Sequence, residues 1–287
     1  MTGEQQQRES EPLDSERSAD LEEHTEELDG IPVFWRRGPS ASGAPVVYLH
    51  GVPTSSDDWL PFLSRCGGIA PDLPGFGRSG KRGDWDYSIR GYDAFLERFV
   101  DHLGLDRFAL VMHDWGAVGL ALAQRMPERI ERLVLMNVVP FLPGYRWHWA
   151  ARMWRRRFLG ELFMGSTTRL GLRLLSRASN AAPGPLPEQT LASIWAHFDQ
   201  GTQRAILRLY RSAPPAVLAA AGERLAEIAA PALVVWGDRD PYIPPHFADQ
   251  YGARLPNAEV RHVPSAGHWP WLDEPALVDD VCAFLAR

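Results

Sequence analysis

Short apolar runs alternate with amphipathic stretches along most of this 287-residue chain. The runs at residues 45–49, 107–112, 133–136 and 232–236 are almost continuously apolar. Such runs are typical of strands that are buried on both faces of a parallel sheet. Residues 90–103 instead carry apolar side chains at helical spacing. The alternation therefore predicts an α/β fold, with a mostly parallel central sheet flanked by helices.

The expected sheet begins with a hairpin. Asp29-Gly30 separates extended runs at residues 24–28 and 31–35, and this dipeptide between two strands is a strong hairpin signal. Further strands are expected at residues 68–72 and 258–263. Further helices are expected at residues 57–63, from Gly116 onward, and at 218–228, 247–255 and 275–285.

The alternation stops between residues 141 and 215. This segment has no convincing buried strand, and it holds eleven Arg and four Trp against three carboxylates. We interpret it as a helical subdomain inserted between two halves of the sheet, and we expect it to end at Pro214-Pro215, which cannot continue a helix. The predicted organisation is an acidic tail (1–22), a core (23–140 and 216–287) and a helical insertion (141–215).

The net charge of −6 belongs to the N-terminal tail. Residues 1–22 hold seven carboxylates against two arginines, so the rest of the chain carries only −1. The charge of the body therefore points to neither an acidic nor a basic partner. Because the tail is polar and nearly free of large apolar groups, we expect it to be disordered.

Composition and cysteine content suggest the compartment. A hydrophobic share of 45% with 23% charged residues is ordinary for a globular protein. No apolar run approaches the ~20 residues that cross a bilayer, and no secretory signal is recognisable. Cys66 and Cys282 lie far apart in the sequence and near no histidine cluster. We expect both to be reduced and buried, in a cytoplasmic protein.

Three candidate reactive side chains each follow a predicted strand. Asp114 lies on a strand-to-helix turn, Asp240 follows the strand at 232–236, and His268 follows the last strand. Because the carboxyl ends of parallel strands share one edge of a sheet, these side chains can converge. Their order along the chain, nucleophile, acid and histidine, is the order found in α/β-hydrolases. Asp238 competes with Asp240 for the role of the acid.

Five motifs carry a resemblance to a known family. They are residues 50–54 (HGVPT), 72–79 (DLPGFGRS), 113–116 (HDWG), 236–240 (WGDRD) and 267–269 (GHW). Over about residues 25–287 the chain resembles α/β-hydrolase-fold enzymes with an aspartate nucleophile, the epoxide hydrolases and haloalkane dehalogenases. The resemblance implies that residues 141–215 form a cap domain over the active site.

This resemblance and the chemistry of a carboxylate predict a two-step reaction. Asp114 attacks a saturated carbon and forms an alkyl ester with it. His268, oriented by Asp240, then takes a proton from the water that attacks the ester carbonyl. The backbone N–H groups of Val52 and Trp115 are expected to stabilise the resulting oxyanion.

Two leaving groups remain open. An epoxide oxygen needs a proton, which Tyr210 can supply from a segment that resembles the ring-opening part of epoxide hydrolase caps; Tyr145 is the only other tyrosine of the insertion. A halide needs N–H donors, such as the indole of Trp115 and that of a Trp in the insertion, either Trp154 or Trp149. Val52 lacks the side-chain donor of many dehalogenases. We favour hydrolysis of an epoxide to a vicinal diol, and the alternative is conversion of a haloalkane to an alcohol and halide. A different hydrolysis on this scaffold and a non-catalytic binding role are also open.

The expected substrate is a small hydrophobic organic molecule that reacts with water, without a cofactor or metal. The residues placed around it are His50, Pro53, Tyr145, Trp154 and Trp269. We expect no nucleic-acid partner, no membrane span, and a monomer or homodimer. The arginines of the insertion could attract anionic substrates or a membrane surface, or could simply be the solvated faces of amphipathic helices.

Overall fold

The computed structural model describes residues 21–39, 43–180 and 184–287. The predicted acidic tail, residues 1–22, lies outside these ranges except at its end, where the first strand begins at Glu22. Within the described ranges, no helix is both long and apolar enough to cross a membrane.

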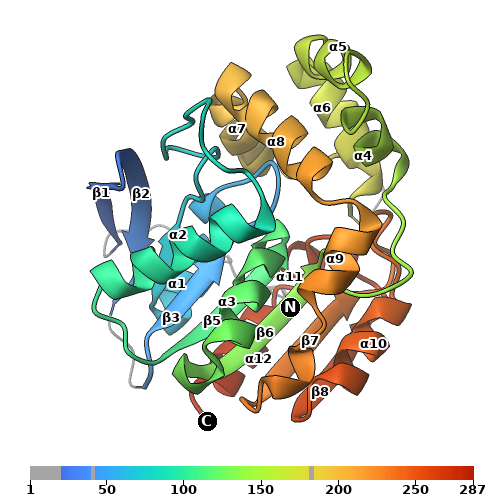
Figure 1. Cartoon of the computed structure of the whole chain (residues 1–287). Coiled ribbons are helices and arrows are strands. Elements are labelled where there is room, and N and C mark those ends of the chain that lie inside the picture. Colours follow the sequence, from blue (N-terminus) through green and yellow to red (C-terminus); the bar gives the residue numbers. More distant parts are fainter. Residues whose placement is uncertain (1–20, 40–42, 181–183) are drawn as a thin grey trace, which may run out of the picture.

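The centre of the molecule is one sheet of eight strands in the order β1-β2-β4-β3-β5-β6-β7-β8 (Figure 1). β1 and β2 form the predicted antiparallel hairpin, β2 also runs antiparallel to β4, and all other neighbours pair in parallel. The mostly parallel sheet is thus confirmed. The strands are β1 (Glu22–Leu28), β2 (Ile31–Arg37), β3 (Val46–Leu49), β4 (Ile69–Pro71), β5 (Phe108–Asp114), β6 (Ile130–Val138), β7 (Ala232–Gly237) and β8 (Ala258–Val263).

Helices cover both faces of the sheet, as the continuously apolar strands require. α2 (Ile89–His102), α3 (Gly119–Arg125) and α10 (His246–Arg254) pack on one face. α1 (Leu60–Cys66) and α12 (Leu277–Leu285) pack on the other face. Each face has its own apolar core, and the inward side chains of β3, β5, β6 and β7 alternate between the two.

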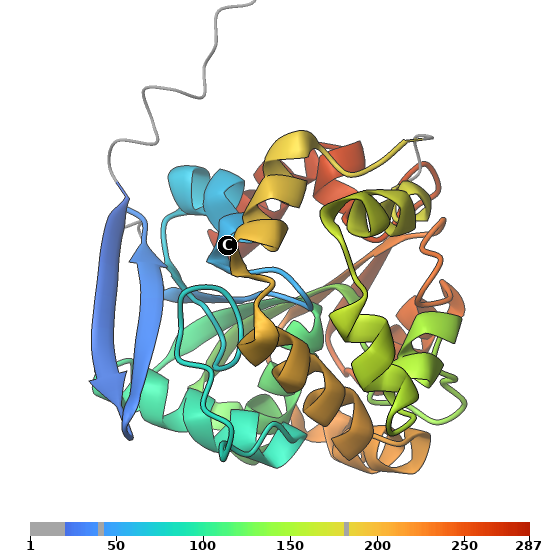
Figure 2. The ribbon, with the colours of Figure 1, turned by 90° about the horizontal axis from the view of Figure 1, so that it is seen from above.

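Six α-helices follow β6 before the chain returns to the sheet at β7, which confirms the predicted helical insertion. The helices are α4 (Trp149–Trp154), α5 (Leu159–Gly165), α6 (Arg169–Leu175), α7 (Glu188–His197), α8 (Gln200–Ser212) and α9 (Pro215–Ala221). In Figure 1 α4 to α8 lie above the carboxyl ends of the strands, whereas α9 lies beside the sheet; Figure 2 shows the same helices from above.

The last long helix of the insertion, α8, ends at Ser212, directly before Pro214-Pro215. Pro215 then opens the next helix, α9, because proline is tolerated at the first position of a helix, where its missing N–H costs nothing. The helix expected at residues 218–228 is therefore split into α9 and a 3-10 turn at Leu225–Glu227. The helix expected at 275–285 is similarly preceded by a separate turn, α11 (Pro270–Asp273).

The sheet order positions the candidate reactive loops. From β3 the chain continues to β4 on one side of β3, whereas β5 lies on the other side. This reversal opens a crevice at the carboxyl ends of β3 and β5, where α/β folds commonly bind ligands. The loops that follow β3 and β5 begin at His50 and Trp115, and both border this crevice.

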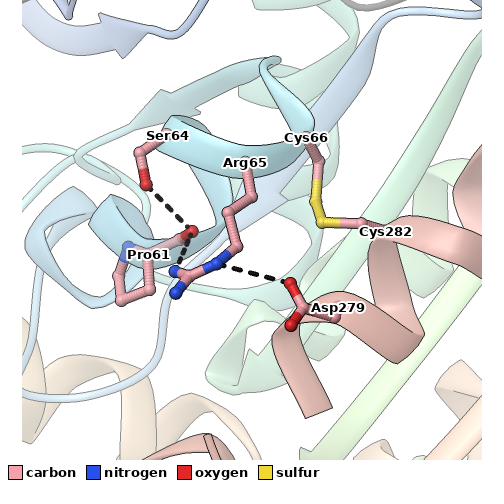
Figure 3. Close-up of a disulfide and its surroundings, with 6 residues drawn as sticks. All are labelled: Pro61, Ser64, Arg65, Cys66, Asp279 and Cys282. Carbon is pink, nitrogen blue, oxygen red and sulfur yellow. Dashed lines mark hydrogen bonds and ion pairs between the residues drawn. A yellow bond between two sulfur atoms is a disulfide. The ribbon is translucent and has the colours of Figure 1, made fainter. Parts of the chain in front are cut away.

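The expectation of two reduced cysteines is wrong. Cys66, at the end of α1, forms a disulfide with Cys282 of α12, and the two Cα atoms lie 5.3 Å apart (Figure 3). The separation of 216 residues in sequence gave no indication that α1 and α12 pack side by side. Arg65 and Asp279 form an ion pair across the same two helices, with N–O 3.3 Å. The cysteines therefore give no support for a reducing compartment.

We predict that this disulfide contributes measurably to stability. The bond closes a long loop in the unfolded chain, so Cys66→Ser/Cys282→Ser should lower the free energy of unfolding by about 2–4 kcal/mol. Urea titrations with and without a reducing agent measure the difference. The double variant, as the control, should not respond to the reducing agent. Two reactive thiols in the denatured, unreduced protein would contradict the bond.

Candidate active site

Asp114 ends β5 in a backbone conformation that is unusual for a residue with a side chain. Its φ is 48°, and a 3-10 turn at Trp115–Val118 leads directly from it into α3. The turn needs Gly116, because a Cβ at this position would lie 2.1 Å from the carbonyl oxygen of Leu49. A strained strand-to-helix turn of this kind presents its side chain above the edge of the sheet.

Two backbone N–H groups hold the Asp114 carboxylate. The N–H of Val52 donates to Oδ1 over 2.8 Å, and the N–H of Trp115 also hydrogen-bonds to the carboxylate. The Val52 loop comes this close because residue 51 is glycine, where a Cβ would lie 2.4 Å from Cβ of Asp114. The two groups predicted to form an oxyanion hole therefore both hydrogen-bond to the Asp114 carboxylate.

His268 lies between two carboxylates. Its Nδ1 is 2.7 Å from Oδ2 of Asp240, and its Nε2 is 3.7 Å from Oδ2 of Asp114. All three side chains are buried. Asp238, the competing acid, instead pairs with His262 over 2.6 Å in a part-exposed position. The structure thus brings Asp114, Asp240 and His268 together and leaves Asp238 out.

Further hydrogen bonds fix the Asp240 carboxylate. Oδ1 accepts the N–H groups of Tyr242 (2.7 Å) and Ile243 (3.1 Å), and Oδ2 accepts the side-chain amide of Asn137 (2.8 Å). Asn137 also bonds both backbone groups of Gly237, so it ties the end of β6 to the end of β7. These bonds leave Oδ2 aimed at the His268 ring.

The buried site raises the pKa of Asp114 and of His268. Burial raises the pKa of Asp114, although the charge of His268 and the two N–H donors oppose this shift. Burial alone would lower the pKa of His268, but Asp240 and Asp114 beside it leave that pKa raised. Asp58 adds to this effect, and its own pKa rises to about 7 because it is buried. Asp114 and His268 thus each shift the pKa of the other.

A cavity of about 250 Å³ opens from Asp114 and His268 into the helical insertion. Pro53, Tyr145, Trp154 and Trp269, all expected around the substrate, line it. Most of its remaining wall is apolar and comes from residues 141–215, where α4, α5, α6, α7 and α8 each contribute side chains. The cavity therefore suits a small, largely apolar molecule.

His50 does not line this cavity, contrary to the expectation. Its Nε2 accepts the N–H of Leu73 over 2.9 Å, and its Nδ1 lies 2.7 Å from the carbonyl oxygen of Gly51. Both ring nitrogens are thus satisfied by backbone groups, and the ring is fully buried. His50 holds the loops after β3 and β4 together instead of contacting a substrate.

The predicted leaving-group donors gather at the wall of the cavity next to Asp114. The Tyr210 ring packs against Trp115, with ring centroids 5.2 Å apart, and against Trp154, at 4.9 Å. Burial raises the pKa of Tyr210 and of Tyr145 well above the usual value, and the charge of Asp114 contributes to both shifts. The indole nitrogens of Trp115 and Trp154 are buried and have no hydrogen-bond partner of good geometry within the described structure. Phenol and indole donors are thus both available.

Two residues that hydrogen-bond to the His268 backbone, His113 and Ser179, were not predicted from the sequence. His113 lies 2.8 Å from the His268 carbonyl oxygen through its Nε2. Ser179, in the insertion, accepts the His268 N–H over 2.8 Å and shares a 2.7 Å hydrogen bond with the Tyr242 hydroxyl. His113 could have been suspected from its place before Asp114, whereas no local pattern marks Ser179. The insertion is therefore hydrogen-bonded directly to the loops that carry Asp240 and His268.

Comparisons with known proteins agree with this architecture. The family model described as alpha/beta hydrolase fold matches residues 44–275. A haloalkane dehalogenase of Mycolicibacterium paratuberculosis is 31% identical over 248 residues, which cover 79% of this chain and 75% of that protein. A cis-3-alkyl-4-alkyloxetan-2-one decarboxylase of Xanthomonas campestris is 30% identical over 282 residues, which cover 87% of this chain and 90% of that protein.

Solved structures give the same result. Haloalkane dehalogenase DbeA from Bradyrhizobium elkani is 28% identical and superposes with a TM-score of 0.80, covering 93% of this chain and 98% of DbeA. The epoxide hydrolase CorEH superposes with a TM-score of 0.79, covering 93% of this chain and 99% of CorEH, but at 22% identity it shows the fold alone. The comparisons thus favour the dehalogenase alternative over the epoxide interpretation. The chain belongs to the α/β-hydrolase fold family, and its relatives include haloalkane dehalogenases.

Proposed function

We propose that this chain is a hydrolase in which Asp114 attacks a saturated carbon of a small hydrophobic substrate. The observation that carries this proposal is the contact of Asp114 with His268, whose other ring nitrogen bonds Asp240. Because Oδ1 is held by the Val52 N–H, Oδ2 is the oxygen free to attack. The new C–O bond makes an alkyl ester of Asp114, and the leaving group departs with the electron pair of the broken bond.

In the second step, water hydrolyses this ester. Nε2 of His268 removes a proton from water, and the water oxygen attacks the carbonyl carbon of Asp114. The oxyanion forms at Oδ1, where the N–H groups of Val52 and Trp115 stabilise it. In comparable sites one such donor lowers the barrier by about 2.7–4 kcal/mol. Collapse of the intermediate releases the alcohol and restores the carboxylate.

The first candidate for the leaving group is a halide. The relatives named as haloalkane dehalogenases support it, together with the buried indole N–H of Trp154, which has no hydrogen-bond partner within the described structure. Indole N–H groups can solvate a departing halide without supplying a proton. In this proposal residues 141–215 are the cap domain, and Trp154 is its halide donor.

The second candidate is an epoxide oxygen, and the two buried tyrosines favour it. Tyr210 and Tyr145 both line the cavity, and both are close enough to Asp114 for its charge to raise their pKa. A neutral phenol can donate a proton to the alkoxide formed when the epoxide opens. The product is then a vicinal diol rather than an alcohol and a halide ion.

We expect the ester intermediate to accumulate in His268→Gln. The first step needs only the Asp114 carboxylate, whereas the second step lacks its base. Intact-protein mass spectrometry after incubation with haloalkane and epoxide panels should show a covalent adduct on the variant. His262→Gln, whose ring pairs with Asp238 away from the site, is the matched control and should show none. If no substrate gives an adduct, the covalent Asp114 mechanism is wrong.

Conservative changes in the cap separate the two leaving groups. Trp154→Phe removes an indole N–H and should slow halide release by about 10-fold or more, while epoxide opening changes little. Tyr210→Phe should produce the opposite pattern, because only epoxide opening needs the phenol proton. Halide release and diol formation are measured in parallel for both variants. An unchanged rate of halide release in Trp154→Phe would remove Trp154 as a donor.

The rate of ester hydrolysis should fall on the acid side of the pH profile, because His268 must be neutral to act as the base. Asp240 raises the pKa of His268 and still does so in the ester, whereas the contribution of the Asp114 charge is lost when Asp114 is esterified. Asp240→Asn should lower this pKa, so the acid limb moves to lower pH while the maximal rate drops. Asp238→Asn should leave the profile unchanged. Single-turnover decay of the ester across pH 5–9 tests this, and a profile that Asp240→Asn does not move would contradict it.

A further inference from the structure

Among the described residues, the large apolar side chains that are exposed to solvent lie in the helical insertion, apart from Val217 of α9. Phe158 is 84% exposed, Leu162 70%, Leu170 66% and Trp149 53%. The other exposed ones are Leu159, Leu174, Leu175 and Val217. In Figure 1 the helices α5 and α6, which carry several of them, are the elements furthest from the sheet. Scattered single apolar residues are normal on a surface, but a cluster on one face marks an interaction site.

Arginines lie among these apolar side chains. Between residues 146 and 177 there are eight Arg and one carboxylate, Glu161, which pairs with Arg211. Arg146, Arg152, Arg156 and Arg157 are exposed and form no ion pair within the described part of the chain. Eleven Arg against three carboxylates give residues 141–215 a charge of +8, so the rest of the chain, whose total is −6, carries −14. The insertion thus carries a net positive charge, whereas the rest of the chain is net negative.

Phe158 is the most exposed of these side chains. It precedes α5 with a φ of 65°, in the left-handed region that bulky residues rarely adopt. Its carbonyl oxygen accepts the N–H of Leu162, and its own N–H bonds the Glu161 carboxylate, so the backbone is held locally. The ring, in contrast, points to solvent and makes no ring contact within the described structure.

We propose that this face of the cap, made of Trp149, Arg152, Arg156, Arg157, Phe158, Leu162, Leu170 and Leu174, binds the surface of an anionic lipid bilayer. Apolar side chains can enter the region between headgroups and acyl chains while arginines contact the negative headgroups. A second copy of this chain fits less well, because pairing two such faces brings positive charges together. The −14 on the rest of the molecule orients the positive insertion toward the lipid.

This arrangement also connects lipid to the candidate active site. Trp149 of α4 and Leu175 of α6 are exposed, and they also line the cavity above Asp114. Phe163 of α5 and Leu172 of α6 line it as well. A lipophilic substrate dissolved in the bilayer would thus enter the cavity without crossing water. This consequence rests on the proposed hydrolase function, whereas lipid binding itself does not.

The test is co-sedimentation of the full chain with phosphatidylcholine vesicles that contain or lack about a quarter phosphatidylglycerol. We expect binding to the anionic vesicles only, with at least a 10-fold loss between low and high salt. Arg156→Glu/Leu162→Ser should abolish it. Arg254→Glu/Val217→Ser, which changes the same residue types outside the proposed face, should bind as the native chain does. Asp114→Ala should also bind normally, so failure of the hydrolase proposal and failure of lipid binding are distinguishable.

Three outcomes would overturn the proposal. One is absence of binding to anionic vesicles at low salt. Another is equal binding to neutral vesicles, which would remove the role of the arginines. The third is a concentration-dependent dimer in analytical ultracentrifugation that Leu162→Ser disrupts, because the face would then be covered by a second copy.

Discussion

The site depends on one constraint, the burial of the Asp114 carboxylate. Asp114 is 6% exposed, and a buried charge is costly unless hydrogen bonds or an opposite charge compensate for it. Compensation comes from the Val52 loop, from the turn that begins at Trp115, and from His268. Only a fold that brings the ends of β3, β5 and β8 to one edge can supply all three, and the parallel sheet order does this.

The groups around Asp114 are in turn held by long-range contacts rather than by their own loops. Asp240 is fixed by Asn137, which ties β6 to β7, and the backbone of His268 is bonded by His113 and by Ser179. Ser179 belongs to the insertion, so the position of the helical insertion is transmitted to His268 by a hydrogen bond. The packing of the helical insertion and the position of His268 are therefore not independent in this molecule.

The sequence was sufficient for the sheet and for the convergence of Asp114, Asp240 and His268, because both depend on local patterns. Continuous apolar runs locate buried strands, and the residues that follow those strands must meet at one edge. Contacts between distant segments were not predictable in this way. The Cys66–Cys282 bond depends on how α1 and α12 pack, and the burial of His50 depends on the loop after β4. The wall of the cavity likewise requires five short helices to be assembled.

The leaving group of the proposed reaction likewise depends on contacts between distant segments. Tyr210 packs directly on Trp115 and Trp154, so the phenol and both indoles are neighbours on one side of the cavity. Trp115 does not line the cavity, whereas Tyr210 and Trp154 do, because the Tyr210 ring stands against the Trp115 indole. A halide would therefore meet Trp154 before Trp115, and an epoxide oxygen would meet Tyr210 first. The chemistry is decided by which of these two side chains faces the departing atom while the carbon lies in line with Oδ2 of Asp114.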